Sequence, residues 1–417
     1  MHEENYKNRA TTDAAARGMK NGWRMVKFGD VVDCTNLVER DALAAGLERY
    51  VGLEHIEPEC LHIKNRGLVK DGTSFTRKFV KGQVLFGKRR AYQRKVAVAE
   101  FDGICSSDIL TFQPKNDELI SELLPFIVQS DGFFDHALGT SAGSLSPRTK
   151  WSQLKEYAFP LPPKDEQRRV AETLWAADEV IQQYSVSLRG AENLRRVFLS
   201  KLMEAGADSC RCKNTPLGPL PETWDVIRVG DAGEVQLGRQ RAPKYQTGKY
   251  TRPYLRVANV FDNRLDLSDV LSMDFGESDF RTFSLRPGDI LLNEGQSREL
   301  VGRCAMYHGE VKDCCFQNTL IRFRSGVRVL PDFALAWFHY AFYRGLFAEV
   351  ARQTTSIAHL GAGRFSSLYM PIPPPDEQSH ILHLVEVIGE SRGEIEQHLC
   401  NTKNLKRTVT EQLLRCE

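Results

Sequence analysis

One motif decides the architecture of this chain and occurs twice, first as Pro160-Leu161-Pro162-Pro163-Lys164-Asp165-Glu166-Gln167 and, 211 positions later, as Pro371-Ile372-Pro373-Pro374-Pro375-Asp376-Glu377-Gln378. Each copy is followed by apolar residues at alternating spacings of four and three, the pattern of a coiled-coil seam. The predicted seam contains, after the first copy, Val170, Leu174, Ala177, Ile181, Tyr184, Leu188, Ala191, Phe198 and Leu202, and after the second copy, Ile381, Val385, Ile388, Ile395, Leu399, Thr402, Val409 and Leu413. The offset of 211 holds without a gap through both patterns, which predicts two long helices of one design.

These two helices could be unrelated, each covering its own domain, or they could pair with each other along the seam. A gap-free repeat of both motif and seam favours pairing, as an antiparallel coiled coil. Each helix would then be about 50 Å long at 1.5 Å per residue, and the prolines and the Asp-Glu pair suit helix N-termini. One basic seam position is repeated as Arg195 and Lys406, within Asn193-Leu194-Arg195-Arg196 and Asn404-Leu405-Lys406-Arg407, while Arg392 stands where the first helix has Ile181.

Length and composition bound the class of protein. The 417 residues exceed one ordinary domain, and a hydrophobic content of 41% excludes wholesale disorder. The segment Met1-His2-Glu3-Glu4-Asn5 lacks the pattern of a signal peptide, and no run approaches the roughly 18 apolar residues of a membrane span. We therefore expect a cytoplasmic protein without membrane association. The ten cysteines lack zinc-ligand spacing, so reduced thiols and no metal are expected.

The globular parts are also repeated. The stretch from Trp23 to Asp30 is matched by Trp224 to Asp231 at an offset of 201, and Gly82-Gln83-Val84-Leu85-Phe86 by Gly288-Asp289-Ile290-Leu291-Leu292 at 206. Because the offset then reaches 211, insertions have collected in the globular parts while the helices kept their length. The predicted fold class is α/β (α+β), a tandem duplication of a globular domain followed by a long helix.

The predicted domains follow this repeat: residues 1–160 globular, 161–206 helical, 207–372 globular and 373–417 helical. Short strands are predicted at residues 82–86, 95–99, 109–112, 289–292 and 319–323. Helical patterns cover residues 119–129 and 333–351. The Gly-, Pro- and Ser-rich residues 206–221 are interpreted as a helix stop followed by a linker.

The sequence lacks the familiar catalytic signatures. No Walker-type phosphate loop, adenine-methyltransferase tetrapeptide or nucleophile elbow is present, and His380 and His383 have no third metal ligand nearby in the sequence. The chain is therefore interpreted as a binding protein with no cofactor and no metal of its own.

Two loops are the leading candidates for contact with double-stranded DNA. In the first globular part, residues 87–95 place five cationic side chains around one aromatic ring, where Arg suits guanine edges and Lys suits phosphates. Residues 293–303 hold the corresponding place and offer amides and acids instead. An ordinary solvated turn is the alternative for each. The candidate DNA-binding residues are Lys88, Arg89, Arg90, Tyr92, Arg94, Lys95, Asn293, Gln296, Arg298 and Arg303, with weaker candidates Ser144, Arg148, Arg239, Arg241, Gln317 and Asn318.

From Trp23 onward, the chain resembles the specificity subunit of a type I DNA restriction–modification enzyme. The most specific marks are the twice-used Pro-x-Pro-Pro-x-Asp-Glu-Gln motif, the equal helices, and the segments Gly288 to Leu292 and Cys314-Cys315-Phe316-Gln317-Asn318. One departure is Gln83 in the first part where the second has Asp289. The resemblance implies two target-recognition domains, each reading one half of a split, asymmetric DNA site.

In that family the paired helices set the unread spacer and dock two modification subunits and two restriction subunits. S-adenosylmethionine, ATP and magnesium would be bound by those partners, which methylate adenine and cleave DNA. A ruler also follows from the residues, because helices of about 50 Å could hold two readers more than one turn of DNA apart at 3.4 Å per base-pair step. The alternatives are a stand-alone DNA-modifying enzyme and a coiled-coil interaction protein without a DNA role.

Overall fold

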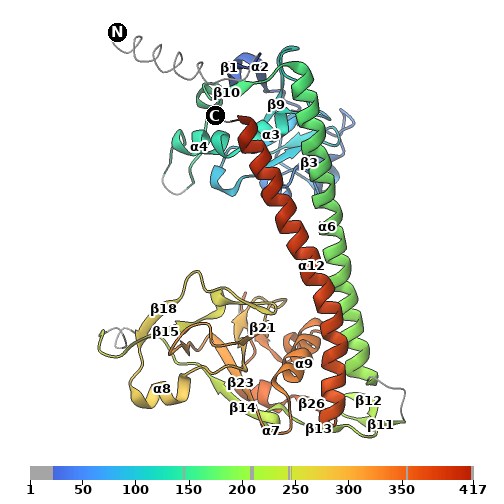
Figure 1. Ribbon diagram of the computed structural model, residues 1–417, viewed down its shortest axis with the longest axis vertical. Helices are drawn as coiled ribbons and strands as arrows, with labels where there is room; N and C mark the ends of the chain where they lie inside the picture. The colour runs from blue at the N-terminus through green and yellow to red at the C-terminus, as the bar shows by residue number, and fades with distance from the viewer. Residues whose placement is uncertain are drawn as a thin grey trace. The chain divides into compact units, whose positions relative to one another are not determined.

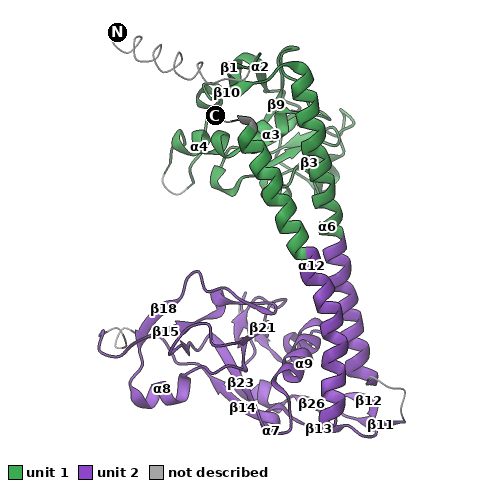
Figure 2. Ribbon diagram, in the orientation of Figure 1, with its two compact units in different colours: residues 1–186, 396–417 green, residues 187–395 purple. Residues whose placement is uncertain are grey.

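The computed structural model describes residues 22–143, 146–206, 211–242, 245, 247–353 and 356–414, without the side chains of residues 413 and 414. The chain forms two compact units, coloured separately in Figure 2. Unit 1 contains residues 1–186 and 396–417, and unit 2 contains residues 187–395. Each unit therefore combines a globular part with segments of both long helices, α6 (Lys164–Ala205) and α12 (Pro375–Leu414).

The globular part of unit 1 is built on two four-stranded sheets, ordered β2-β9-β6-β7 and β4-β3-β8-β5. A separate antiparallel pair, β1 with β10, brings the first strand beside the strand that leads into α6. The elements are β1 (Arg24–Lys27), α2 (Phe28–Val31), β2 (Val32–Thr35), β3 (Arg49–Val51), β4 (Gly67–Leu68), β5 (Arg77–Phe79), β6 (Val84–Gly87), β7 (Val96–Val98), β8 (Gly103–Cys105), β9 (Ile109–Pro114), α3 (Leu124–Gln129), α4 (Asp131–Gly139), α5 (Trp151–Leu154) and β10 (Ala158–Leu161).

Unit 2 has the same plan, with sheets β14-β23-β19-β21 and β18-β15-β22 and the pair β13 with β26. Three additional small sheets accompany them among the described residues: β16-β17, β20-β25-β24, and the pair of β11 (Cys212–Thr215) with β12 (Gly218–Pro221). The elements are β13 (Asp225–Arg228), α7 (Val229–Ala232), β14 (Gly233–Leu237), β15 (Thr251–Leu255), β16 (Val260–Phe261), β17 (Arg264–Leu265), β18 (Leu271–Asp274), α8 (Glu277–Phe283), β19 (Asp289–Asn293), β20 (Gly295–Gln296), β21 (Cys304–Tyr307), β22 (Cys315–Phe316), β23 (Leu320–Ser325), α9 (Pro331–Tyr343), α10 (Leu346–Val350), β24 (Arg352–Gln353), β25 (Ala358–His359), α11 (Ala362–Ser367) and β26 (Tyr369–Ile372).

The duplication extends to the strand pairing. In unit 1, β3 pairs in parallel with β8 through Tyr50 and Ile104, and in unit 2, β15 pairs in parallel with β22 through Tyr254 and Cys315. The departure at Gln83 is also explained, because its Oε1 accepts from the Val80 amide as the Asp289 carboxylate accepts from the Arg286 amide. The predicted tandem duplication is therefore present in the backbone as well as in the sequence.

The central strands β6 and β19 are buried on both faces. In β6, Val84 and Phe86 lie in one apolar cluster and Leu85 in another, because successive side chains of a strand point to opposite faces. In β19, Ile290 and Leu291 divide in the same way between two clusters. This double burial explains why both segments are continuous apolar runs in the sequence.

The two long helices lie side by side within each unit (Figure 1). In unit 1, α6 buries Val170, Leu174 and Ile181, and the ring of Tyr184 stacks on that of His398 of α12 at 5.7 Å. In unit 2, α6 and α12 bury Leu202 and Ile381, and Arg392 pairs with Glu192 at 3.6 Å. In unit 1 the N-terminal part of α6 thus packs against the C-terminal part of α12. In unit 2 the C-terminal part of α6 packs against the N-terminal part of α12, as an antiparallel pair requires. The remaining predicted seam residues are half-buried: Ala177, Leu188, Ala191, Phe198, Val385, Ile388, Ile395, Leu399, Thr402 and Val409. The side chain of Leu413 lies outside the described residues.

Three local predictions differ from the structure. The linker prediction is wrong for residues 212–221, which form a hairpin of β11 (Cys212–Thr215) and β12 (Gly218–Pro221) with Leu220 buried. The helix predicted from residue 119 begins at Leu124, since the Ile120 amide donates to Gln167 instead of to a helical carbonyl. The helix predicted over residues 333–351 is divided into α9 and α10 by Gly345 at φ 78°, a left-handed conformation that ends a helix.

Candidate nucleic-acid interface

The basic loop of unit 1 is a strained turn held by its surroundings. A 3₁₀ turn at Ala91–Gln93 is flanked by Arg90 and Arg94, which have φ angles of 56° and 52°. Non-glycine residues with positive φ are uncommon and persist only where neighbouring contacts fix them. The contacts that fix this turn come from its own basic side chains and from its backbone.

Arg94 and Lys95 point inward and support the turn. The Arg94 guanidinium donates from Nη2 to the Gln129 carbonyl at 2.7 Å and pairs with Asp131 at 2.9 Å. It also lies 4.5 Å from the centre of the Phe134 ring. Lys95 Nζ donates to the Leu53 carbonyl at 2.6 Å. These two cations therefore hold the loop against α3, α4 and the 3₁₀ turn at Leu53–His55.

A second predicted segment joins the loop from the far side of the sequence. Arg89 and Arg148 form a backbone bridge, and the Arg90 amide donates to the Pro147 carbonyl at 2.8 Å. Both arginine side chains face Asp108, with Arg148 Nε at 2.9 Å and Arg89 Nη1 at 3.5 Å. Burial by itself would raise the pKa of Asp108, but the Arg148 hydrogen bond and the nearby cations lower it overall. Ser144, predicted in this segment, lies outside the described residues.

Arg90 and Tyr92 are the loop residues that face solvent most fully. The Arg90 side chain is exposed, and Tyr92 is 56% exposed. Lys88 is half-buried, and this burial lowers the pKa of its ammonium group. An exposed guanidinium beside an exposed aromatic ring, on a turn held in one conformation, is suited to contacts with base edges and sugars.

In unit 2, the corresponding loop is divided into inward and outward residues. Asn293 is fully buried at the end of β19, and its amide donates to the Val260 carbonyl at 3.3 Å. Arg303 donates to the same carbonyl at 2.8 Å, and burial lowers its pKa. Gln296 is half-buried in β20, and Arg298 is exposed. Gln296 and Arg298 are therefore the predicted residues of this loop that reach the surface.

Sequence reasoning missed the residues that pair with this second loop. Strand β20 pairs with β25 through Gly295 and His359, and His359 Nδ1 lies 3.0 Å from Glu294 Oε2. A usable signal was present, because the helix offset of 211 applied to Arg148 leads to His359. Both loops are thus braced by the segment that precedes the last strand of their globular part.

The weaker candidates of unit 2 also meet. Arg239 and Gln317 form a parallel bridge, and the Asn318 amide donates to the Arg239 carbonyl at 3.0 Å. The Arg239 side chain is only 10% exposed and pairs with Asp279 at 2.6 Å. Arg241 is exposed, whereas Gln317 and Asn318 are half-buried.

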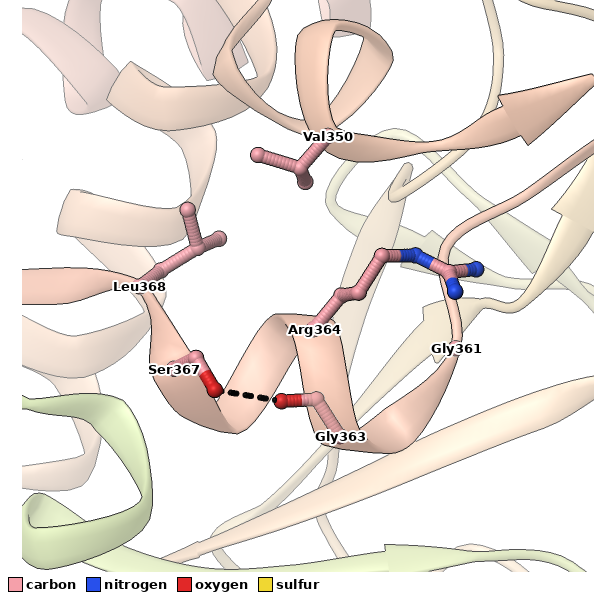
Figure 3. A pocket seen from close by; sticks show the side chains of 6 residues that line it. All are labelled: Val350, Gly361, Gly363, Arg364, Ser367 and Leu368. Carbon is pink, nitrogen blue, oxygen red and sulfur yellow. Dashed lines mark hydrogen bonds between the residues drawn. The ribbon is translucent and has the colours of Figure 1, made fainter.

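A hollow beside α11 is lined by residues that lie on both sides of His359 in the sequence (Figure 3). Its lining is Val350, Gly361, Gly363, Arg364, Ser367 and Leu368. Arg364 Nη2 already donates to the His359 carbonyl at 2.7 Å, and Ser367 donates to the Gly363 carbonyl at 2.8 Å. Its polar side chains are therefore engaged in holding α11 and β25.

Within the described part of the chain, no group of three His, Cys, Asp or Glu side chains is arranged to hold a metal ion. Nor does any of the described helices combine the length and the apolar character that crossing a membrane requires.

Comparison with known proteins gives one consistent result. A family model described as the type I restriction modification DNA specificity domain matches residues 20–184 and 221–402. The type I restriction enzyme EcoDI specificity subunit of Escherichia coli is 29% identical over 194 residues, which are 43% of this chain and 41% of that protein. The type I restriction enzyme EcoKI specificity subunit of E. coli K12 is 23% identical over 307 residues, which are 68% of this chain and 64% of that protein. This chain thus spans less than two thirds of the length of these relatives.

The fold is shared with a solved structure described as "Structural basis underlying complex assembly and conformational transition of the type I R-M system". The TM-score is 0.56 at 19% identity, and the match covers 95% of this chain and 98% of that chain.

Proposed function

Because this chain belongs to the family of type I restriction–modification DNA specificity domains, we propose that it is the DNA-recognition subunit of a type I restriction–modification complex. Each globular part reads one half of a split, asymmetric site on double-stranded DNA, and the paired helices set the spacer between the halves. The observation that carries this proposal is one backbone plan used twice with unlike edge loops, cationic and aromatic around Tyr92 and amide-containing around Gln296.

The proposed contacts in unit 1 are Arg90 and Tyr92, with Arg148 at their side. Arg90 would donate to guanine or phosphate, and Tyr92 would stack on or wedge against a base or sugar. Arg89, Arg94 and Lys95 would act on DNA through the conformation of the turn. In unit 2, the proposed contacts are Gln296, Arg298 and Arg241, because these candidates reach the surface.

The proposed partners supply the chemistry. Two modification subunits would bind S-adenosylmethionine and methylate adenine, and two restriction subunits would use ATP and magnesium to translocate and cleave DNA. The chain itself would be noncatalytic, bind no cofactor and act in the cytoplasm. Affinity of the isolated chain for DNA would be modest and would fall with salt, because few exposed cations are available to neutralise phosphates.

The test is to co-express the chain with its modification subunit and map N6-methyladenine across the host DNA by single-molecule sequencing. A split motif methylated on both strands is the expected result, and it would give the target sequence directly. If an assembled complex methylates no split motif, the proposed function is wrong.

A further inference from the structure

The repeated Asn-Leu-Arg/Lys-Arg motif places a buried cation on the seam of unit 1. Lys406 of α12 is 8% exposed, and its ammonium group bonds to Asp178 Oδ1 of α6. The same ammonium lies 5.1 Å from the centre of the Phe126 ring of α3. Next to it, Arg407 makes two hydrogen bonds, of 2.8 and 2.9 Å, to Asp131 Oδ2 of α4. The motif therefore joins α12 both to α6 and to the globular part.

The second oxygen of Asp178 is held by the globular part. His62 Nε2 lies 2.8 Å from Asp178 Oδ2, and His62 Nδ1 lies 3.0 Å from Glu100 Oε1. His62 belongs to the segment between β3 and β4, and its ring meets the Trp175 indole edge-on at 6.4 Å. The helix α6, the helix α12 and the segment between β3 and β4 therefore meet at the buried carboxylate of Asp178.

This arrangement requires a proton on both ring nitrogens. Ionised carboxylates only accept hydrogen bonds, so a ring placed between Glu100 and Asp178 satisfies both contacts only as imidazolium. The hydrogen bond to Asp178 raises the pKa of His62, although burial opposes the shift. Burial by itself would raise the pKa of Asp178, but the His62 hydrogen bond and the charge of Lys406 lower it overall.

The corresponding place in unit 2 is built differently. The offset of 211 leads from Asp178 to Gly389, which has no side chain, and from Lys406 to Arg195. The guanidinium of Arg196 lies 4.5 Å from the centre of the Tyr343 ring, and the Tyr343 hydroxyl donates to Asp262. The histidine of this region, His339, is fully buried, and burial lowers its pKa to about 4. Among its described residues, unit 2 therefore has no counterpart of the His62–Asp178 pair at this place.

We infer that His62, Asp178 and Lys406 form a proton-dependent clasp that positions the globular part of unit 1 on its helix segments and makes reading by this unit sensitive to pH. The inference rests on the proposed function. All three are positioning residues, because they act on DNA only through the placement of the loop that carries Arg90 and Tyr92.

The direction of the pH effect follows from the shift of His62. A folded-state pKa raised above the ordinary value of about 6.5 gives a clasp that is complete below that pH. The clasp is then lost as the pH rises through the higher folded-state pKa. Glu100, Asp178 and, through Asp178, Lys406 are the charged groups that face the ring from the elements around it.

The test uses the assembled modification complex and DNA duplexes that carry the mapped site with its native spacer or with one extra base pair. The readout is the ratio of methylation rates on the altered and native duplexes between pH 6 and pH 9. For the native protein we expect this ratio to rise at least about tenfold with pH, the scale of one charge-assisted hydrogen bond. His62→Gln should give the high ratio at every pH, because its side chain cannot become charged.

His136→Gln is the matched control, since His136 lies in unit 1 but its Nε2 bonds to the Gln153 carbonyl and not to a carboxylate. It should keep the native profile. If His62→Gln does not assemble, Glu100→Gln serves instead, because the Glu100 side chain is half-exposed. This change removes a hydrogen bond that raises the pKa of His62, so it should move the midpoint of the profile to lower pH. A flat native profile, a native slope in His62→Gln, or an unmoved midpoint in Glu100→Gln would overturn the clasp. Absence of any methylated split site would instead overturn the proposed function.

Discussion

Gln167 and Gln378 make the same three hydrogen bonds in their respective units, although 211 positions separate them in the sequence. Gln167 donates to the Glu118 and Pro162 carbonyls and accepts from the Ile120 amide. Gln378 donates to the Arg328 and Pro373 carbonyls and accepts from the Leu330 amide. Both side chains are buried. The last residue of the repeated motif therefore fixes the start of each long helix to the loop that follows the central sheet.

Replacing either glutamine by alanine should destabilise its unit. Each change leaves two carbonyls and one amide without their side-chain partner, and an unsatisfied buried polar group costs about 1–3 kcal/mol. Urea unfolding should therefore show a lower free energy of unfolding for Gln167→Ala and for Gln378→Ala. The exposed Gln183 of α6 gives the control, because Gln183→Ala should leave stability unchanged. Equal effects of all three changes would refute the role of the motif.

Removing one heptad from each long helix should shorten the spacer of the recognised site. Deleting residues 184–190 and 395–401, which correspond under the 211 offset, shortens each helix by about 10 Å, or about three base-pair steps. The two half-sites should keep their sequences, since no loop is altered. Methylation mapping of the variant complex measures both properties at once. Changed half-sites with an unchanged spacer would contradict the ruler.

Arg90 and Arg94 flank the same turn but should respond differently to alanine. Arg90 is exposed, so Arg90→Ala should leave stability unchanged and reduce methylation of sites with the native unit 1 half-site about tenfold, the loss of one base contact. Arg94 holds Gln129 and Asp131, so Arg94→Ala should lower the melting temperature as well. Melting curves and methylation rates of the two variants separate these effects. If Arg90→Ala lowered the melting temperature without reducing the methylation rate, Arg90 would not be a DNA contact.

Asp274 should make unit 2 sensitive to acid. Its carboxylate accepts hydrogen bonds from Thr247, Gly248 and Tyr250, and the Thr247 hydroxyl is the largest contributor in lowering its pKa to about 2. Because the folded pKa lies below the unfolded value of about 3.9, this stabilisation is present above pH 4 and is lost as the pH falls towards 2. Acid unfolding of Asp274→Asn should be less steep in that window than that of the native protein. Asp332→Asn, an exposed change in α9, should behave as the native protein does.

The sequence was sufficient for the helices, the duplication and the central strands, because these rest on periodicity and repetition. The helix pattern that begins near Val170 and the apolar run of β6 each reflect burial on defined faces. The hairpin β11-β12 was missed because glycine and proline suit a hairpin turn as well as a linker. The helix break at Gly345 was not predicted, because apolar residues continue on both sides of it.

The candidate interface was predicted less completely. Composition located the loop of Arg90 and Tyr92, but it could not separate the outward Arg90 from the inward Arg94, since both are arginines within four positions of each other. Partners far apart in the chain decide that difference, as Gln129 and Asp131 do for Arg94. His359 could have been found from the 211 offset of Arg148, but its contact with β20 follows only from the strand pairing.

The division of unit 1 between residues 1–186 and 396–417 has a consequence for how the protein is made. Unit 2 is one continuous segment and has all its residues as soon as it leaves the ribosome. Unit 1 must wait for Lys406 and Arg407, which are translated more than 200 residues after Val186. At about 5–20 residues per second, the globular part of unit 1 spends roughly 10–40 s without its second helix. In a nascent chain, unit 2 can therefore fold before unit 1 is complete. A chaperone that shields Phe126 and Leu174 would act during that interval.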